Sequence, residues 1–481
     1  MDAFVQFLND TVNAFGVTVM LPIFIFFFAI ILGTKPGRAF RAAITIGVAF
    51  VGINLVIGLM WGAMSDVSQA IVTNAGIQRD IVDVGWPAAA AVAFATRVGL
   101  LVIPIAIIVN FVLLIPGITK TLNVDVWNFW HYAFAGSLVA AVTGNLALGL
   151  AAAAVSSAAM LWLGDWTGPA IQQFYELPGI SIPHGFTAPY VIPALPVNWL
   201  YGKIPVVKDW DADPEAVERK LGPVFGDPMM LGFWIGVVLG LIAYVSEFPG
   251  AIVPTLAKIL ILGITLAAVM VILPRMVRIL MEGLIPISEA ARDFMNRRAS
   301  GREIYIGLDS AVLIGHPSNI AVGMLLVPVA ILLSVILPGN RMILFADLAV
   351  LPFLVSQCAP MAKGNIIRMM VIGTWLLILG FYVANALAPV ITEVAGEAGF
   401  AIPENAVMIS SIADGFQPYP WVTMVLTDLL GWAGLGILTV ALAVAWFFYK
   451  KNATAWEKAV GWEEEEPESA SPEWDAAVTT G

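Results

Sequence analysis

Residues 305–328 read YIGLDSAVLIGHPSNIAVGMLLVP, and this stretch decides the fold class. It lies in an apolar context, yet it carries a cluster of polar side chains: Asp309, Ser310, His316, Ser318 and Asn319. Ionisable groups at bilayer depth cost several kcal/mol unless they face protein or a water-filled cavity, so they mark functional sites. The stretch therefore predicts a polar site inside a membrane protein.

The composition places the rest of the chain in the same class. Of its 481 residues, 60% are hydrophobic and 12% are charged, whereas soluble domains carry about 25% charged residues. The sequence therefore predicts an all-α polytopic membrane protein. The first apolar run has no basic flank, so we expect no cleavable signal peptide. The single cysteine, Cys358, excludes a disulfide framework, and no nucleotide-binding or hydrolase motif is present.

The polar stretch continues into a segment that resembles an earlier one. Residues 322–333 (VGMLLVPVAILL) and 98–109 (VGLLVIPIAIIV) share six of twelve positions. Two further pairs follow in the same order: Gly-Asn at 144–145 and 364–365, and HGF at 184–186 with DGF at 414–416. Three collinear matches predict a duplicated chain of about 220 residues per copy.

The basic residues orient the two copies. Lys35, Arg38 and Arg41 follow the first apolar run and Lys450-Lys451 follows the last, which puts these segments in the cytoplasm and the N-terminus outside. We expect about eleven transmembrane helices from this pattern. The first copy then starts outside and the second inside, so the sequence predicts inverted repeats.

The expected elements follow from periodicity and helix breakers. Apolar spans are expected at 11–33, 42–61, 229–247, 251–273, 343–360, 366–389 and 429–449, with two short spans within 127–164. Amphipathic helices at the membrane surface are expected at 64–83 and 282–302. Broken or re-entrant segments are expected at 86–115 and in the proline-rich hairpin 165–198, and an external loop at 390–428. The acidic segment 452–481 predicts a disordered tail.

All three histidines of the chain, His131, His184 and His316, fall in polar, proline-broken motifs. A single His in a helix is more often a satisfied core residue, but the shared setting of all three predicts a polar pocket. The sequence has no H-x-x-x-H motif and no cysteine pair. We therefore expect neither a metal site nor a cofactor.

Asp309 is the first candidate for ligand binding. Its carboxylate would accept hydrogen bonds from vicinal hydroxyls, and neighbouring His and Asn side chains suit a polyol. The alternative is a buried ion pair or a cap for residues 310–316. Trp86 aligns within one residue of Asp309 across the repeat and is a candidate aromatic partner or, alternatively, an interfacial anchor. Asp414, the repeat counterpart of His184, binds ligand or caps a turn.

The candidate substrate-binding residues share polar motifs or repeat positions: Trp86, Asn128, His131, His184, Asp309, Ser310, His316, Asn319, Gln357 and, ranked below these, Asp414. Lys363 and Arg368 lie near an expected cytoplasmic helix end, and we interpret them as topology signals.

The chain resembles the galactitol family of phosphotransferase-system IIC permeases in four segments: GRAFRAAITIGVAFVGINLVIG (37–58), NVDVWNFWHYAF (123–134), SIPHGFTAPY (181–190) and IGLDSAVLIGHPSN (306–319). The resemblance covers roughly residues 10–450. It extends to the ascorbate permeases of the same system.

This resemblance implies a homodimer in which a V-motif and a mobile core domain work as an elevator. The implied parts are a V-motif at 1–61 and 229–282, a core at 62–228 and 283–428, a last helix at 429–451 and the tail at 452–481. The implied location is the bacterial cytoplasmic (inner) membrane.

The resemblance also implies group translocation of galactitol or a similar polyol. A separate phosphorylated IIB subunit would phosphorylate the sugar, and this chain would carry no phosphoryl group itself. In the ascorbate relatives the substrate is held by an aromatic residue, two His and an Asp, which match Trp86, His131, His184 and Asp309. Gly185 stands where the ascorbate pattern has Gln. Asp309 and His131 are the implied candidates for accepting the proton of the attacked hydroxyl.

Two other functions fit the same sequence. One is an ion-coupled secondary carrier of the same fold without phosphotransfer partners, in which Asp309 and His316 would be coupling groups. The other is a sensor or assembly subunit that docks through its acidic tail.

Overall fold

The computed structural model describes residues 19, 22–23, 25–75, 79–206, 210, 212, 219, 222, 224, 227–298, 303–344, 346–402 and 406–464. Within these residues seven helices are long and apolar enough to cross a membrane, or eight if a bent pair counts as one span. The prediction of a helical polytopic membrane protein is confirmed. The first part of the expected span 11–33, residues 11–18, lies outside the described residues. The count of eleven spans stays a prediction.

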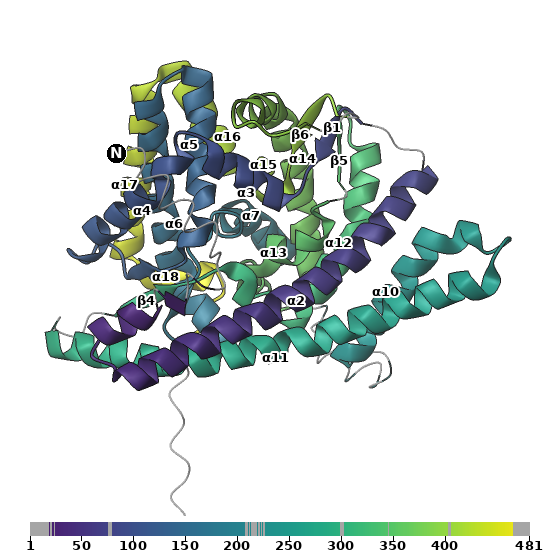
Figure 1. Cartoon of the computed structure of the whole chain (residues 1–481), viewed down its shortest axis with the longest axis horizontal. Helices are drawn as coiled ribbons and strands as arrows, with labels where there is room; N and C mark the ends of the chain where they lie inside the picture. Colours follow the sequence, from purple (N-terminus) through teal and green to yellow (C-terminus); the bar gives the residue numbers. More distant parts are fainter. Residues whose placement is uncertain are drawn as a thin grey trace, which may run out of the picture.

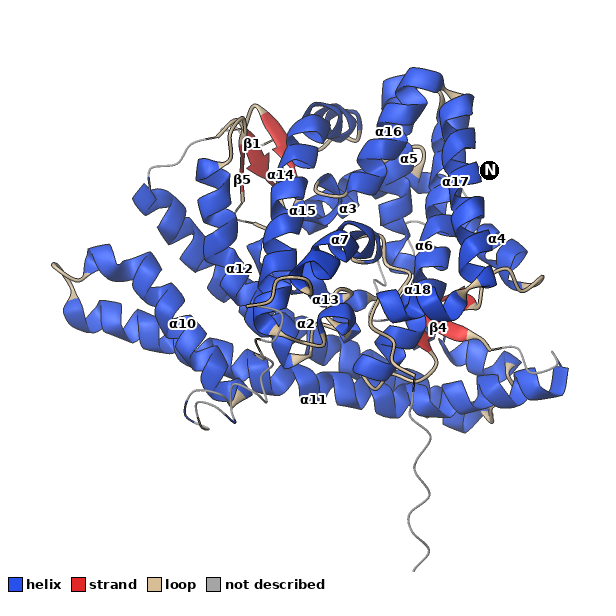
Figure 2. Cartoon of the chain, turned by 180° about the vertical axis from the view of Figure 1, so that it is seen from behind, coloured by secondary structure: helices blue, strands red, loops and turns tan. Residues whose placement is uncertain are grey.

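Three long helices lie along one edge of the molecule (Figures 1 and 2): α2 (Pro36–Ala75), α10 (Pro228–Tyr244) and α11 (Ile252–Arg298). A Cβ at Gly52 would lie 2.3 Å from the Met276 sulfur, so glycine lets α2 and α11 approach closely. The prediction of separate surface helices at 64–83 and 282–302 is wrong, because their described parts belong mainly to the long helices α2 and α11. Helix α2 continues from its apolar part into its amphipathic part through Gly62, and α11 continues through Pro274 and Pro286.

The other elements build the body of the molecule. Those of the first half are β1 (Ile81–Asp83), α3 (Trp86–Ala95), α4 (Gly99–Leu114), β2 (Thr121–Asn123), η1 (Val126–Phe129), α5 (Trp130–Thr143), α6 (Leu146–Phe174), β3 (Ile180–Ser181), η2 (Ala188–Tyr190) and α7 (Val191–Tyr201). A short turn, η3 (Val245–Glu247), follows α10.

The elements of the second half are β4 (Tyr305–Gly307), η4 (Ser310–Val312), α12 (Pro317–Ile336), β5 (Met342–Ile343), η5 (Leu348–Val350), α13 (Leu351–Ser356), η6 (Pro360–Ala362), α14 (Ile366–Glu397), β6 (Met408–Ser410), α15 (Ile412–Gly415), α16 (Pro418–Leu430), α17 (Trp432–Lys451) and α18 (Ala453–Ala459). One large hydrophobic core runs through both halves.

The broken segment expected at 86–115 is confirmed. Helices α3 and α4 meet at an angle of 89°. The Thr96 hydroxyl donates to the Ala93 carbonyl and accepts from the Gly99 amide, which satisfies backbone groups that the break exposes. A Cβ at Gly99 would lie 2.1 Å from the Ala93 oxygen, so the turn requires glycine at this position.

The two Gly-Asn pairs have the same local geometry. Gly144 and Gly364 adopt positive φ values of 62° and 69°. Each following asparagine caps the next helix, because the Asn145 side chain accepts from the Leu148 amide and the Asn365 side chain accepts from the Arg368 amide. Both pairs therefore end one segment and begin a long helix, α6 or α14.

Two small parallel sheets connect the halves of the chain. One has the strand order β5-β1-β6 and the other β2-β4-β3. In each sheet the central strand comes from one half and both outer strands come from the other. Ile81 pairs with Met342 in the first sheet and Tyr305 pairs with Thr121 in the second, so the central strands pair in the same way.

Three expected segments differ in the structure. Residues 343–360 form the short pieces η5 and α13 instead of a span, because Pro352 and Pro360 interrupt helical hydrogen bonding. Segment 390–428 is mostly helical, since α14 extends to Glu397 and α16 begins at Pro418. The segment 452–464 is ordered and includes α18. The rest of the expected tail, 465–481, lies outside the described residues.

Candidate functional site

A connected series of polar side chains, called the polar chain below, runs through the interior of the protein. It begins at His131 on α5. Its Nδ1 lies 2.9 and 3.0 Å from the two carboxyl oxygens of Asp414 on α15. The two side chains are 3% and 1% exposed. A buried carboxyl group is costly without partners, so this contact ties α15 to α5 as well as orienting the imidazole.

His184 continues the chain towards the second half. Its Nε2 lies 3.4 Å from His131 Nε2, with the rings edge to face at 4.6 Å between centroids. The same nitrogen lies 3.7 Å from Asp309 Oδ1. Among the described residues, His184 Nδ1 has no hydrogen-bond partner although it is buried. This nitrogen is therefore free to accept or donate a further bond.

Asp309 is the most exposed member of the polar chain, because 17% of its side chain is accessible to solvent. Its Oδ1 accepts from the Ala311 amide at 2.8 Å, which makes it the cap of η4. Asn128 donates to Asp309 Oδ2 at 2.9 Å and to Asp125 Oδ2 at 2.5 Å. The capping interpretation of Asp309 is confirmed. Its role in ligand binding stays a prediction, and the carboxylate also faces Asn128 and His184.

The two sheets explain why these residues meet. Asp125, Asp309 and His184 follow β2, β4 and β3, the three parallel strands of one sheet. Parallel strands end at the same edge, where side chains from separate segments converge. Asp414 likewise follows β6 in the other sheet. His131 lies between the two edges and joins the two groups of side chains.

A second cluster holds two other candidates. His316 caps α12, and its ring lies 4.7 Å from the Phe174 ring and 5.6 Å from the Tyr175 ring. Asn319 donates to the Tyr175 hydroxyl and to the Leu313 carbonyl, both at 2.7 Å. These contacts fix the beginning of α12. Among the described residues, no hydrogen bond or ring contact joins either residue to the polar chain that contains His131. The contacts of this cluster are packing contacts, and the substrate-binding roles of His316 and Asn319 stay predictions.

Ser310, Gln357 and Trp86 support the site from its edges. Ser310 is buried beside Asp309, and its hydroxyl has no hydrogen-bond partner in the described part of the chain. Gln357 donates to the Ile182 carbonyl at 2.7 Å and so holds the loop before His184. Trp86 begins α3, and its amide donates to Asp347 Oδ1 at 2.7 Å.

Sequence reasoning missed Asp125 and Asp347. Both are buried acids, at 4% and 0% exposed, in a chain with few charges. Asp347 accepts from the Trp86 amide, the Ser411 hydroxyl and the Ile412 amide, so it joins three segments. For Asp347 the available signal was an acid directly after the apolar run 342–346. Asp125 follows the mixed strand β2 and had only its position beside the WNFWH segment as a signal. No group of three His, Cys, Asp or Glu suited to a metal ion occurs among the described residues.

Known proteins resemble this chain over most of its length. Residues 12–405 match the family model of the "PTS system sugar-specific permease component", EIIC-GAT. The chain belongs to the EIIC-GAT family. The resemblance inferred from the sequence is thereby confirmed.

Two curated relatives from Escherichia coli (strain K12) illustrate the match within the EIIC-GAT family. A "putative permease IIC component" is 36% identical over 440 residues, which is 90% of this chain and 96% of the relative. A "PTS system galactitol-specific EIIC component" is 36% identical over 408 residues, 85% of this chain and 88% of the relative. As an EIIC-GAT protein, the chain is a multi-pass sugar permease component of the phosphotransferase system in the inner membrane.

Proposed function

We propose that this EIIC-GAT protein carries galactitol or a similar polyol and presents it to a separate phosphorylated IIB subunit. The observation that carries the proposal is the chain of Asn128, Asp309, His184 and His131, which combines a partly exposed carboxylate with amide and imidazole groups. The 36% identity to a galactitol-specific relative supports the substrate class.

Asp309 is the proposed centre of substrate binding. Its carboxylate accepts hydrogen bonds from neighbouring hydroxyls, and charged acceptors bind hydroxyls more strongly than neutral ones do. Asn128 and His184, which face Asp309, orient the same carboxylate and add bonds of their own. Trp86, Ser310 and Gln357 shape the site, and Asp125 holds the Asn128 amide.

His131 and Asp414 form the proposed proton-handling pair. When His131 Nδ1–H donates to the Asp414 carboxylate, His131 Nε2 keeps a lone pair. His184 Nε2 then donates to His131 Nε2, and the unpartnered His184 Nδ1 is left as an acceptor. During phosphoryl transfer from IIB, the attacked hydroxyl loses its proton to Asp309, or to His131 Nε2 once the hydrogen bond from His184 to that nitrogen is broken.

The proposed architecture is a pair of inverted repeats within a homodimer that works as an elevator. Support for the repeats comes from the two sheets. Ile81 and Tyr305 occupy equivalent central positions 224 residues apart, and Val82 pairs with Ile409 as Ile306 pairs with Ile180. We assign α2, α10 and α11 to the dimerising V-motif and the body to the moving core. The proposed orientation has the N-terminus outside and the C-terminus in the cytoplasm.

The test is uptake of labelled galactitol by membrane vesicles that contain the chain, with and without phosphorylated IIB. We expect galactitol phosphate to accumulate only with IIB. Free galactitol accumulating without IIB would instead establish a secondary carrier, and no uptake in either case would reject galactitol as the substrate.

Asp309→Asn is the matching variant. We expect binding of galactitol to weaken about tenfold, since a hydrogen bond to a charged group contributes about 1.5–3 kcal/mol. Phosphorylation should fall further than binding, because the variant cannot accept a proton. Asp428→Asn, which changes an exposed acid on α16, is the control. Unchanged phosphorylation in Asp309→Asn would refute the proton-accepting role.

A further inference from the structure

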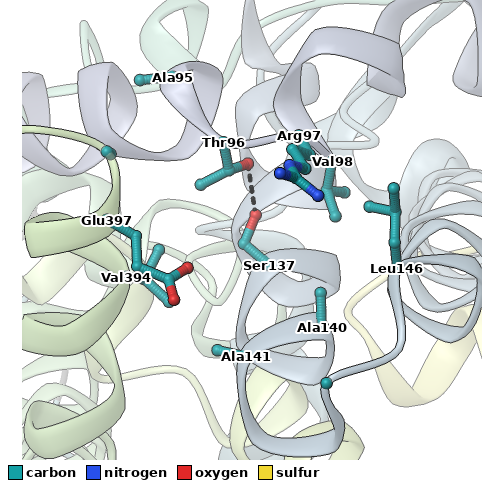
Figure 3. Close-up of a pocket in the computed structure, with 12 residues that line it drawn as sticks. Ala95, Thr96, Arg97, Val98, Ser137, Ala140, Ala141, Leu146, Val394 and Glu397 are labelled. Atoms are coloured by element: carbon teal, nitrogen blue, oxygen red, sulfur yellow. Dashed lines mark hydrogen bonds between the residues drawn. The ribbon is translucent and has the colours of Figure 1, made fainter.

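A cavity of about 520 Å³ lies apart from the polar chain described above. It opens where the α3–α4 break, the end of α5 and the end of α14 meet (Figure 3). Ligand sites in proteins commonly have volumes of about 300–1,000 Å³, so this cavity holds a hexitol-sized molecule. None of the residues of the His131–Asp309 chain lines it.

Two hydroxyls form a polar centre on its wall. Thr96 Oγ1 and Ser137 Oγ lie 2.8 Å apart, and Ser137 Oγ lies 2.6 Å from the Ala133 carbonyl oxygen. Whichever hydroxyl donates to the other shares its single proton with a backbone carbonyl. Figure 3 shows this pair between the side chains of Arg97 and Glu397. The hydroxyl oxygens keep lone pairs that accept further hydrogen bonds.

Arg97 and Glu397 supply opposite charges at the same cavity. No hydrogen bond or ion pair joins either side chain to another residue in the described part of the chain. An arginine within a broken membrane segment is costly unless it lines a polar cavity or has a function. Both side chains are exposed. One basic and one acidic group leave the lining without net charge, and together with the two hydroxyls they offer donors and acceptors to a neutral ligand with several hydroxyl groups.

We infer that this cavity is an outer binding site for a neutral polyol, from which the sugar enters the protein. The inference rests on the proposed function and on the proposed orientation, which puts the end of α14 outside. Ser137 follows His131 by six residues on α5, about 9 Å along a helix that rises 1.5 Å per residue. The outer site therefore precedes the Asp309 site on the path inward.

The test is equilibrium binding of radiolabelled galactitol to the purified full-length chain in nanodiscs of phosphatidylethanolamine and phosphatidylglycerol, without IIB. We expect two galactitol molecules per chain with different affinities. Arg97→Gln and Glu397→Gln should each weaken one of the two classes of binding at least tenfold and leave the other unchanged. Glu393→Gln is the matched control, because this exposed acid lies one turn earlier on α14 and does not line the cavity.

Comparison with Asp309→Asn separates the two proposals. Binding lost in Asp309→Asn but unchanged in Arg97→Gln would overturn the outer site and leave the proposed function standing. Binding weakened by Arg97→Gln but unchanged by Asp309→Asn would support the outer site and overturn the proposed role of Asp309 in substrate binding. In each variant, galactitol binding at the site that the substitution does not touch shows that the protein is folded. Phosphatidylethanolamine that copurifies with the wild type and is lost in Arg97→Gln would assign the cavity to lipid and overturn the inference.

Discussion

Gly185 illustrates how one small residue sets the geometry of the site. A Cβ at this position would lie 2.3 Å from His131 Cβ, closer than real side chains approach. The residue lets the His184 loop lie directly against α5, which brings the two imidazoles together. In this structure a larger side chain at position 185 would displace His131.

Gly185→Ala should therefore weaken galactitol binding strongly. The added methyl group must push His131 away from Asp414 or move the His184 loop, and a displacement of about 1 Å costs on the order of 100-fold in a positioned site. Binding of labelled galactitol measures the effect. Gly37→Ala, where a Cβ meets nothing within 4 Å, is the control. Equal affinities in Gly185→Ala and Gly37→Ala would contradict the packing argument.

At the scale of elements, the C-terminal segment 452–464 is bound to the body of the protein. Trp166 donates its indole N–H to the Trp456 carbonyl at 2.7 Å, and the two rings lie 5.1 Å apart. Gln173 and the backbone of Glu463 exchange two hydrogen bonds of 2.9 and 2.8 Å, and Lys363 pairs with Glu463. The sequence predicted a disordered tail here because acidic composition outweighed the two tryptophans. In the folded protein Trp456 packs against Trp162, Trp166 and Tyr449.

Deletion of 452–481 should lower the thermal stability of the chain, whereas deletion of 465–481 removes none of these contacts and should not. Trp456→Ala alone is expected to cost about 1–3 kcal/mol, less than the roughly 3–5 kcal/mol of a fully buried tryptophan, because the side chain is only partly buried. Unfolding in detergent, followed by tryptophan fluorescence, measures both. Equal midpoints for the two deletions would show that the segment does not stabilise the fold.

At the scale of the whole molecule, the two halves depend on each other. Each sheet takes strands from both halves, and the contacts His131–Asp414 and Asn128–Asp309 cross between them. Neither half alone can complete a sheet edge or the polar chain. The site therefore exists only in the assembled protein.

Fragments 1–226 and 227–481 should bind no galactitol when each is expressed alone and should recover binding when they are expressed together. Missing partner strands leave buried backbone groups unpaired in either fragment, which is costly inside a membrane protein. The control is the intact chain cleaved after folding at a protease site inserted within 213–218. Binding by one fragment alone would refute the dependence.

The sequence by itself determined the membrane class, the family, the broken segment at 86–115 and most of the residues of the polar chain. Hydrophobic runs, prolines and polar residues within apolar segments are local signals. They can be recognised in the sequence without knowledge of the fold. Only the tertiary structure joined His131 to Asp414, brought in Asp125, placed His316 and Asn319 in a separate cluster, and brought Arg97 and Glu397 to one cavity. These pairings depend on strands and helices hundreds of residues apart, whose relative positions follow from packing and sheet register, not from local composition.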